Sequence, residues 1–281
     1  MPPFYLTEII RLALAEDVGS GDLTTSLIVP PSTPAQAEIV AKQNLVAAGL
    51  EAARLTFETV DTAVDFDPLV ADGGQAVSGQ VLVRLAGPAA SILTAERVAL
   101  NFLMHLSGVA TLTARFVNAV KPHRVRIVDT RKTTPGWRVL EKAAVRAGGG
   151  ENHRLGLFDG ILIKDNHIAA AGTVTAAVTR AKKGAPHTLK VEVEVSDLPG
   201  LEEAIAAEAD VVLLDNMNLD QLRQAVTLTK GRVLLEASGG INLENVAQVA
   251  ATGVDIISIG ALTHSAPAAD MSLKFNLGEA C

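Results

Sequence analysis

The sequence predicts an α/β protein whose larger part, residues 111–266, is built on a parallel sheet that is either open or closed into a barrel. Two observations carry this prediction. From residue 125 onward, short apolar runs alternate with amphipathic stretches. The runs are rich in valine, isoleucine and leucine and nearly continuous, as expected of strands that are covered on both faces. Aromatic residues make up only 3% of the chain, so small aliphatic side chains do the packing, which suits helices laid on buried strands.

The expected strands and helices of this part follow in strict alternation. The expected strands are VRIVDT, GILIKDN, KVEVEV, VVLLDN, RVLLEAS and DIISIGA. The expected helices are PGWRVLEKAAVRAG, AGTVTAAVTRAKKG, DLPGLEEAIAAE, NLDQLRQAVTLTKG and NLENVAQVAATG. Several of these stretches open with Asp, Asn or Pro and close with Gly, which is typical of helix ends. Alternation of this kind indicates a parallel sheet.

Residues 1–110 have a different pattern and are predicted to form a separate N-terminal domain. AEIVAKQNLVAAGL and DPLVADGGQAVSGQVLVRLAG contain short alternating runs interrupted by glycine, which indicates an antiparallel sheet. Apolar residues recur at helical spacing in SILTAERVALNFLMHLSG, which predicts a helix that joins the two domains.

Composition narrows the classes of function. The formal net charge of -7 argues against nucleic acid as the main partner, because such binding uses a broad basic face. The one cysteine, Cys281, is the last residue, so no disulfide can form within the chain and a cytoplasmic location is predicted. The N-terminus lacks the features of a secretion signal, and the longest apolar stretch, VALNFLMHLSGVATL, is too short and too polar to span a bilayer. No membrane partner is therefore expected.

Positive charge is concentrated in one part of this acidic chain. Residues 129–156 contain six Lys or Arg and His153, against three acidic residues. Guanidinium groups fork onto planar carboxylates or phosphates, so such a cluster predicts a polyanion site. The cations expected to hold the polyanion are Arg131, Lys132, Arg154 and Lys164.

Polar residues also gather where each expected strand ends. Parallel strands place their carboxyl ends along one rim, and ligands bind there. The rim residues are Asp129, Arg131, Lys132, Lys164, Asp165, Asn166, Glu192, Glu194, Asp215, Asn216, Glu236, Ser238, Gly239, Gly240 and Gly260. Any one of them could simply begin a loop. Six polar ends in series indicate a binding site, because buried apolar strands gain nothing from ionic termini.

The rim carries carboxylates on a different arc from the cations. Glu194 and Asp215 could hold Mg²⁺, ribose hydroxyls or both, and they could face the positive charge that develops at a sugar C1. The SGG of residues 238–240, followed by the expected helix INLENVAQVAATG, is typical of a phosphate cradle at a helix start. The chain has no GxxxxGK[ST] motif, which excludes a P-loop protein. Its histidines lack metal-ligand spacing, which argues against a zinc site.

The order of several motifs resembles the quinolinate phosphoribosyltransferases, also called nicotinate-nucleotide pyrophosphorylases (carboxylating). These motifs are EDVGSGDLTT, AER, DTRKTTPG, GGGENHRLGLFDGILIKDNH, VEVEV, LLDN, EASGGI and SIGALTHS, and they span nearly the whole chain. The resemblance implies a type II phosphoribosyltransferase fold. This fold is an irregular, usually seven-stranded α/β barrel with an N-terminal α/β sandwich domain, against which residues 267–281 would pack.

The resemblance also implies a reaction. Quinolinate and 5-phosphoribosyl 1-pyrophosphate would react with Mg²⁺ to give nicotinate mononucleotide, pyrophosphate and CO2, a step of de novo NAD biosynthesis. The implied assembly is a homodimer or a set of dimers, in which Arg97 reaches into the neighbouring site.

Roles are implied for the motif residues as well. The implied quinolinate contacts are Arg131, His153, Arg154 and Lys164, with Thr130 as a further substrate contact. Lys132 would neutralise pyrophosphate, and Glu194 and Asp215 would bind the ribose and the metal, directly or indirectly. The implied 5-phosphate contacts are Ser238, Gly239, Gly240 and Gly260. The implied catalytic residues are Lys164, Glu194 and Asp215, and either Lys164 or His153 would assist decarboxylation.

Two alternatives remain open at this level. A related type II enzyme could use another acceptor, such as nicotinate or the substrate of a molybdenum-associated relative. The cluster of Arg131, His153, Arg154 and Lys164 favours an acceptor with two negative charges. A non-catalytic anion-binding protein is the other alternative. Glu194 and Asp215 argue against it, because a pure anion trap gains nothing from facing carboxylates.

Overall fold

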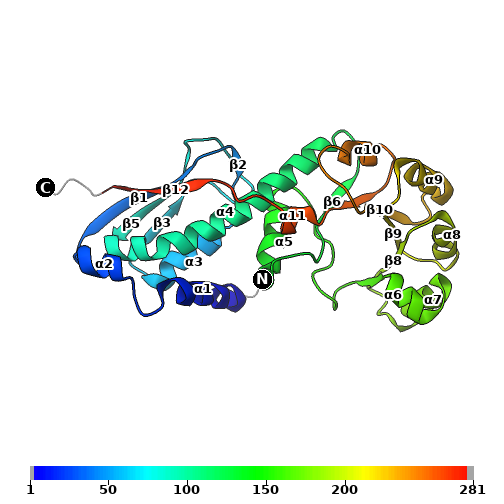
Figure 1. The fold of residues 1–281 in the computed structure, drawn as a ribbon, viewed down its shortest axis with the longest axis horizontal. Helices are drawn as coiled ribbons and strands as arrows, with labels where there is room; N and C mark the ends of the chain where they lie inside the picture. The colour runs from blue at the N-terminus through cyan, green and yellow to red at the C-terminus, as the bar shows by residue number, and fades with distance from the viewer. Residues whose placement is uncertain (1–2, 277–281) are drawn as a thin grey trace. The chain divides into compact units, whose positions relative to one another are not determined.

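The computed structural model describes residues 3–276, and the chain forms two compact units (Figure 1). The first unit contains the chain up to Leu112, Pro135–Gly149 and the segment from Ala266 onward. The second unit contains Thr113–Thr134 and Gly150–Ser265.

The two units interleave along the chain. The sequence predicts two contiguous domains, 1–110 and 111–266. These boundaries stay a prediction. The segment expected to return, 267–281, contributes a strand to the first unit through residues 271–276. Its last five residues, including Cys281, lie outside the described residues.

The first unit is built on a four-stranded antiparallel sheet with the order β12-β1-β5-β3. Its strands are β1 (Pro34–Ala41), β3 (Asp65–Pro68), β5 (Val81–Pro88) and β12 (Met271–Asn276), and a small second sheet pairs β2 (Leu45–Val46) with β4 (Gln75–Ala76). Its helices are α1 (Pro3–Val18), α2 (Leu23–Ile28), α3 (Leu50–Val60), α5 (Arg138–Ala147) and most of α4 (Ala89–Ala119).

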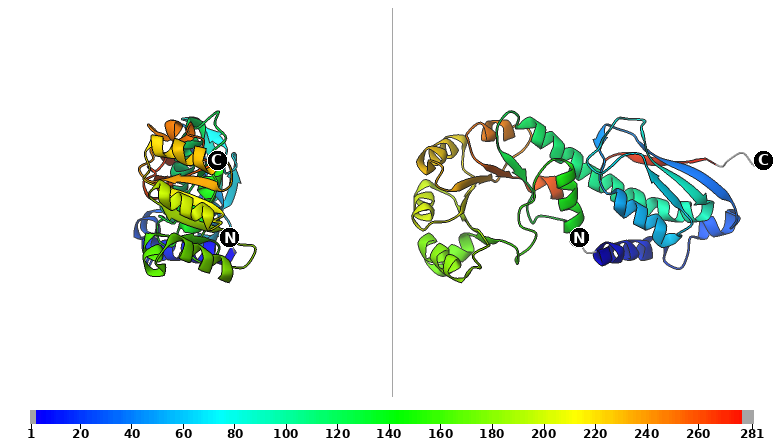
Figure 2. Two further views of the ribbon diagram at one scale, coloured as in Figure 1. Left: turned by 90° about the vertical axis from the view of Figure 1, so that its right-hand side faces the viewer. Right: turned by 180° about the vertical axis from the view of Figure 1, so that it is seen from behind.

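Helices α3 and α4 cover one face of this sheet (Figure 2). The core between them contains Phe57 of α3 and Ile92 and Leu103 of α4, which pack with Ile39 and Leu82 of the sheet. All five side chains are almost completely buried, so each contributes on the order of 1.5–3 kcal/mol of burial free energy. The sheet and helix expected from the sequence in this part are confirmed, although α4 extends beyond its predicted end to Ala119.

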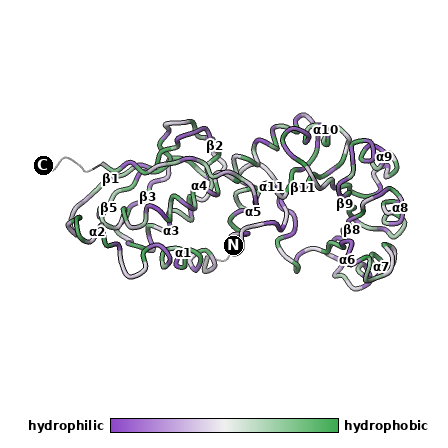
Figure 3. Tube along the Cα trace, in the orientation of Figure 1, coloured by the Kyte–Doolittle hydropathy of each residue, from purple (hydrophilic) through white to green (hydrophobic). Residues whose placement is uncertain are grey.

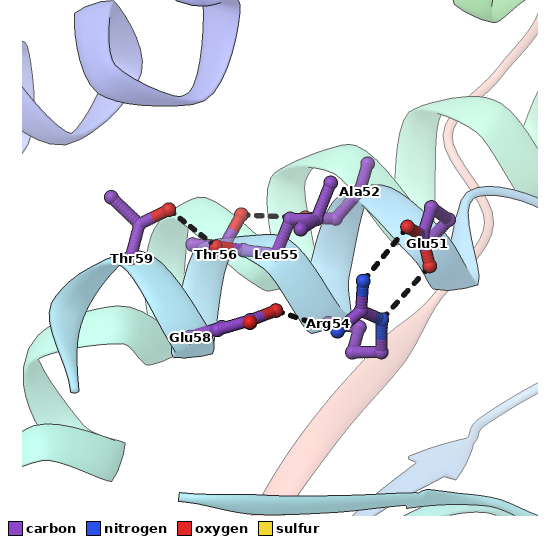
Figure 4. A network of polar contacts seen from close by, with 7 residues as sticks. All are labelled: Glu51, Ala52, Arg54, Leu55, Thr56, Glu58 and Thr59. Carbon is purple, nitrogen blue, oxygen red and sulfur yellow. Dashed lines mark hydrogen bonds and ion pairs between the residues drawn. The ribbon is translucent and has the colours of Figure 1, made fainter. Parts of the chain in front are cut away.

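The outer face of α3 is stabilised locally by ion pairs (Figure 4). Arg54 Nε lies 2.9 Å from Glu51 Oε2, and Arg54 Nη1 lies 2.6 Å from Glu58 Oε2. The i,i+3 and i,i+4 spacing brings these side chains onto the same face of the helix. Exposed pairs of this kind contribute little each, about 0.2–1 kcal/mol, so burial of the opposite face holds α3 in place.

The second unit is an α/β barrel with a six-stranded parallel sheet of order β6-β11-β10-β9-β8-β7. Its strands are β6 (Arg126–Val128), β7 (Ile161–Ile163), β8 (Val191–Val195), β9 (Val211–Asp215), β10 (Leu234–Ser238) and β11 (Ile256–Ser258). Its helices are α6 (Asp165–Ala171), α7 (Val174–Gly184), α8 (Leu198–Ala206), α9 (Leu219–Thr229), α10 (Val246–Ala250) and α11 (Ala261–His264). The predicted fold class is confirmed, and all six expected strands are present.

The seventh strand of the expected barrel is reduced to one residue. Glu151 forms an isolated parallel bridge with Val128, which adds a seventh β position beside β6. The Glu151 backbone N–H donates to the carbonyl oxygen of Ile127 at 2.8 Å. The GGGEN sequence around this position contains no apolar run, which explains why the pattern of strands in the sequence did not include it.

Strand register brings the carboxyl ends of neighbouring strands to one level. Asp215 at the end of β9 is the register partner of Ser238 at the end of β10, and Ser238 is the partner of Ser258 at the end of β11. The loops that follow these strands therefore start side by side. This arrangement is what places the polar strand ends around a common opening.

Hydrophobic residues are distributed through both units (Figure 3). Among the described residues, no helix combines the length and the apolar character needed to cross a bilayer.

Candidate active site

A cavity of about 800 Å³ opens at the carboxyl ends of the second unit's strands. Among its lining residues are all of the predicted site residues except Arg97, namely Thr130, Arg131, Lys132, His153, Arg154, Lys164, Glu194, Asp215, Ser238, Gly239, Gly240 and Gly260. These residues come from strand ends and from the loops that follow them, which the register sets side by side.

Arg97 lies on α4 in the first unit and is not among the residues that line this cavity. Its expected contribution to the site of a neighbouring chain stays a prediction.

Two guanidinium groups give the cavity a basic side. Burial lowers the pKa of Arg154, and the nearby charge of Arg131 lowers it further, while Glu192 and Asp159 act in the opposite direction. Arg154 Nη1 donates to the carbonyl oxygen of Gly160 at 3.0 Å, which fixes the side chain across its own loop. Two neighbouring cations that repel one another favour binding of an anion with two negative groups.

The NHR segment is held by a buried carboxylate at the end of β6. Asp129 is fully buried, and its Oδ1 accepts from the backbone N–H of His153 at 2.9 Å. Its Oδ2 accepts from Asn152 Nδ2 at 2.6 Å. A carboxylate that receives such charge-assisted hydrogen bonds fixes a loop firmly, so Asp129 sets the positions of His153 and Arg154.

The imidazole of His153 has a defined tautomer. The backbone N–H of Arg154 donates to His153 Nδ1 at 2.8 Å. A backbone N–H can only donate, so Nδ1 is an acceptor and the ring proton of the neutral imidazole is on Nε2. That nitrogen lies 3.0 Å from Glu192 Oε2 and 3.8 Å from Glu236 Oε2.

Glu192 and Glu236 form a buried carboxyl pair, of which Glu236 lines the cavity. Burial, followed by the charge of Glu192, raises the pKa of Glu236 to about 7. By donor type these two carboxyls and His153 could ligate a metal, since their ligand atoms lie within 4.8 Å of one another. Glu192 favours the charged form of Arg154, which indicates instead that its carboxylate balances the charge of the basic side.

The acidic side is formed by Glu194 and Asp215. Lys164 Nζ lies 3.2 Å from Glu194 Oε2, and Asp215 Oδ2 accepts from Asn216 Nδ2 at 2.9 Å. Both carboxylates also line an adjoining cavity of about 450 Å³. Carboxylate oxygens are the donors that Mg²⁺ and ribose hydroxyls use, so this side suits a sugar or a hard cation.

Lys164 is placed at the end of its strand by a helix cap. It is the N-cap of α6, and its backbone N–H donates to Nδ1 of His167 at 2.9 Å. The cap fixes the backbone from which the Lys164 ammonium reaches Glu194.

A glycine loop follows β10, as the sequence predicts. Gly239 and Gly240 have φ angles of 95° and 62°, a region that favours glycine. The expectation that a helix begins directly after these glycines is wrong, because α10 begins only at Val246. The side chain of Asn242 accepts the backbone N–H groups of Glu244 and Asn245 and so forms a turn in place of the first helical residues.

Gly260 leaves room where the side chains of Lys132 and His264 approach the backbone. A Cβ at this position would lie 3.0 Å from Lys132 Cδ and 3.1 Å from His264 Nε2. Thr263 Oγ1 donates to the carbonyl oxygen of Lys132 at 2.6 Å, which ties α11 to the segment after β6.

Some lining residues were not selected as site residues from the sequence, among them Asn216, Glu236, Ser258 and His264. His264 follows Gly260 by four residues, which is about one helical turn, so this spacing was the signal that could have identified it. Glu236 was recognised only as a strand end, because its proximity to His153 depends on how the strands pack.

Comparison with known proteins gives the family. The model of the quinolinate phosphoribosyl transferase N-terminal domain matches residues 22–107, and that of the C-terminal domain matches residues 109–274. A probable nicotinate-nucleotide pyrophosphorylase [carboxylating] of Bacillus subtilis is 45% identical over 99% of this chain and 96% of its own length. The Mycobacterium leprae nicotinate-nucleotide pyrophosphorylase [carboxylating] is 46% identical over 94% of this chain and 95% of its own.

Solved structures agree with the sequence relatives. The nicotinate-nucleotide pyrophosphorylase from Francisella tularensis superposes with a TM-score of 0.93 at 40% identity, covering 98% of both chains. A human nicotinic acid phosphoribosyltransferase shares the fold at 15% identity, with a TM-score of 0.65 over 99% of this chain and 74% of its own. The chain belongs to the quinolinate phosphoribosyltransferase family.

Proposed function

We propose that this enzyme transfers the phosphoribosyl group of 5-phosphoribosyl 1-pyrophosphate to quinolinate and releases nicotinate mononucleotide, pyrophosphate and CO2. The observation that carries the proposal is the division of one cavity into a basic and an acidic side. Arg131 and Arg154 lie on the basic side, and Glu194 and Asp215 lie on the acidic side.

The basic side fits a pyridine with two adjacent carboxylates. Arg131 and Arg154 offer guanidinium groups that each carboxylate can engage, and Lys164 offers an ammonium at the border with the acidic side. Nicotinate, with one carboxylate, would leave part of this charge without a partner. The cation arrangement therefore supports quinolinate over the alternative acceptor.

The acidic side and the glycine loop fit the sugar substrate. Glu194 and Asp215 would bind the ribose hydroxyls, and the loop of Gly239 and Gly240 would receive the 5-phosphate through its backbone. The same two carboxylates would hold Mg²⁺, which supplies charge neutralisation for pyrophosphate when bound. Lys132 would bind the pyrophosphate as a point charge.

Catalysis depends mainly on positioning and charge. The protein holds the pyridine nitrogen against C1 of the sugar, and the C1–oxygen bond to pyrophosphate breaks as the nitrogen attacks. The ring nitrogen becomes cationic, which stabilises the electron pair left on the ring when the adjacent carboxylate departs as CO2. That carbon then takes up a proton in place of the carboxylate. Lys164 is our choice for assisting that step, because its ammonium carries three N–H donors and pairs with one carboxylate, Glu194, whereas both ring nitrogens of His153 already have protein partners.

Three further features belong to the same proposal. The enzyme would work as a homodimer or an assembly of dimers, with Arg97 of one chain completing the site of the other. This arrangement is supported by the family resemblance around the AER motif. A cytoplasmic location follows from the cysteine content of the sequence.

The test is release of CO2 from quinolinate labelled in the carboxyl group next to the ring nitrogen. Release should require both 5-phosphoribosyl 1-pyrophosphate and Mg²⁺, and chelation of the metal should abolish it. Pyrophosphate release with nicotinate as the acceptor, and none with quinolinate, would replace the proposal with the related acceptor. Binding of both anions without any pyrophosphate release would indicate the non-catalytic alternative.

A further inference from the structure

Asn216 has a backbone conformation that is rare for a residue with a side chain. Its φ angle is 54°, and the other non-glycine residues with positive φ in the described chain are Glu208 and Lys230. Of these three, Asn216 is the one that lines the cavity. Asparagine tolerates this region better than most residues, yet such outliers concentrate at functional sites, which directs attention to the Asn216 side chain.

The side chain and the backbone of Asn216 contact both halves of the proposed sugar site. Asn216 Nδ2 donates to Asp215 Oδ2 at 2.9 Å, and the backbone N–H donates to the carbonyl oxygen of Ser238 at 2.9 Å. The carboxamide also packs on Gly239, where a Cβ would lie 2.6 Å from Asn216 Cγ and would collide with Oδ1. The residue therefore connects the carboxylate at the end of β9 to the glycine loop after β10.

We propose that Asn216 is a positioning residue that holds Asp215 and the Gly239–Gly240 loop as one rigid unit for 5-phosphoribosyl 1-pyrophosphate. The inference rests on the proposed function, because that one substrate must place its ribose at Asp215 and its phosphate at the glycine loop simultaneously. Fixing both binding elements in advance lowers the entropic cost of binding and orients the sugar for attack. The positive φ is what turns the carboxamide back toward both elements.

The Asn216→Gly variant separates the side chain from the backbone, since glycine accepts the same φ angle. We expect affinity for 5-phosphoribosyl 1-pyrophosphate with Mg²⁺, measured by calorimetry, to fall roughly ten- to a hundredfold, the effect of losing one hydrogen bond to a charged group. Quinolinate affinity should change by less than about twofold, because the amide does not reach the basic side. Lys230→Gly makes the same replacement at a positive φ outside the cavity and should leave both affinities unchanged.

A double-mutant cycle with Asp215→Ala tests whether Asn216 acts through Asp215. In the Asp215→Ala background, Asn216→Gly should cost less affinity for the sugar substrate than it does in the wild type, because only its contact with the glycine loop remains, whereas full additivity would overturn the proposal. If Asn216→Gly does not fold, Asn216→Asp keeps the shape and places a like charge beside Asp215. Unchanged sugar affinity in that variant would also overturn the proposal.

Equal loss of affinity for both substrates would indicate a general structural role and would overturn it as well. The proposed function is tested separately by CO2 release from the unmodified enzyme. A wild-type enzyme that releases CO2, together with an Asn216→Gly variant that binds the sugar normally, rejects only the positioning role.

Discussion

The imidazole of His153 lies 3.0 Å from the buried carboxylate of Glu192, while the backbone N–H of Arg154 occupies its other ring nitrogen. The ring therefore links a buried acid to the backbone of a substrate-binding arginine. In this arrangement His153 is neutral, with its proton on Nε2, and it supports the backbone of Arg154. The positive charge of the basic side comes from the arginines and Lys164.

The first prediction concerns this tautomer. Nitrogen NMR of the ligand-free enzyme should show a neutral His153 with an unprotonated Nδ1, because that atom accepts the Arg154 backbone N–H. Glu192→Gln retains a hydrogen-bond acceptor and should preserve the tautomer, while His153→Ala removes the signal and identifies it. A His153 resonance with both nitrogens protonated near neutral pH would contradict the assignment.

The second prediction concerns the pH dependence of stability. Burial raises the pKa of Glu236 from its ordinary 4.5 to about 7, so the folded protein favours the protonated carboxyl. This contribution is fully present below pH 4.5 and is lost as the pH rises from 4.5 to about 7. Glu236→Gln imitates the protonated form, so over this range it should lose less stability than the wild type.

Denaturant midpoints measured across that interval check this prediction. Glu203→Gln is a suitable control: the pKa of Glu203 is lowered from its ordinary 4.5, so the contribution of its carboxylate to stability is already present above that pH and changes little across the interval. Relative to wild type, the midpoint of Glu236→Gln should change with pH across the interval and that of Glu203→Gln should not, which distinguishes the Glu236 effect from a general response to pH. Parallel curves for wild type and Glu236→Gln would show that Glu236 titrates normally.

The third prediction tests the acceptor contacts. Arg131→Ala and Arg154→Ala should each lower quinolinate affinity or kcat/KM by roughly tenfold to several hundredfold, because each removes a charge-assisted contact to a carboxylate. Steady-state kinetics with varied quinolinate measures this loss. Arg180→Ala removes an exposed cation of α7 in the same unit and should have no effect. Near-wild-type kinetics in both site variants would remove the basis for the acceptor assignment.

The strands of the barrel could be predicted because both of their faces are buried. Val193, Val212 and Ile257 are completely buried, and such strands leave a continuous apolar signature in the sequence. The polar rim was predictable for a related reason, since parallel strands must end at one edge. Glu151 was not predictable, because a single bridge residue produces no periodic pattern.

The contacts of His153 with the two buried glutamates could be established only from the structure. Glu192 is on β8 and Glu236 is on β10, with β9 between them, so their approach to His153 depends on strand order and side-chain direction. The start of α10 at Val246 could not be predicted from the sequence either, because the side chain of Asn242 competes with the helix for backbone N–H groups.

The fourth prediction tests the shared site. Arg97→Ala and Lys164→Ala should each be inactive alone. The first variant lacks the residue that completes the neighbouring site, and the second lacks a residue of the site in its own chain. A mixed dimer would contain one site with both Lys164 from its own chain and Arg97 from the other, so co-refolding should restore activity to a fraction of the wild type. Separately tagged chains and tandem purification isolate the mixed dimer. No recovery in the purified mixed dimer would indicate a site formed within one chain.

The fifth prediction concerns Gly260. Its φ angle is −63°, so alanine is compatible with the backbone and the effect of Gly260→Ala arises from contact alone. The added methyl group would lie 3.0 Å from Lys132 Cδ and 3.1 Å from His264 Nε2, and both side chains must shift by a few tenths of an ångström. Displacement of the Lys132 ammonium weakens its hold on pyrophosphate, so KM for 5-phosphoribosyl 1-pyrophosphate should rise several-fold while quinolinate affinity is retained. Gly184→Ala, at a glycine with open space around it, is the matched control, and an equal rise in KM there would show that the Gly260 effect is not local.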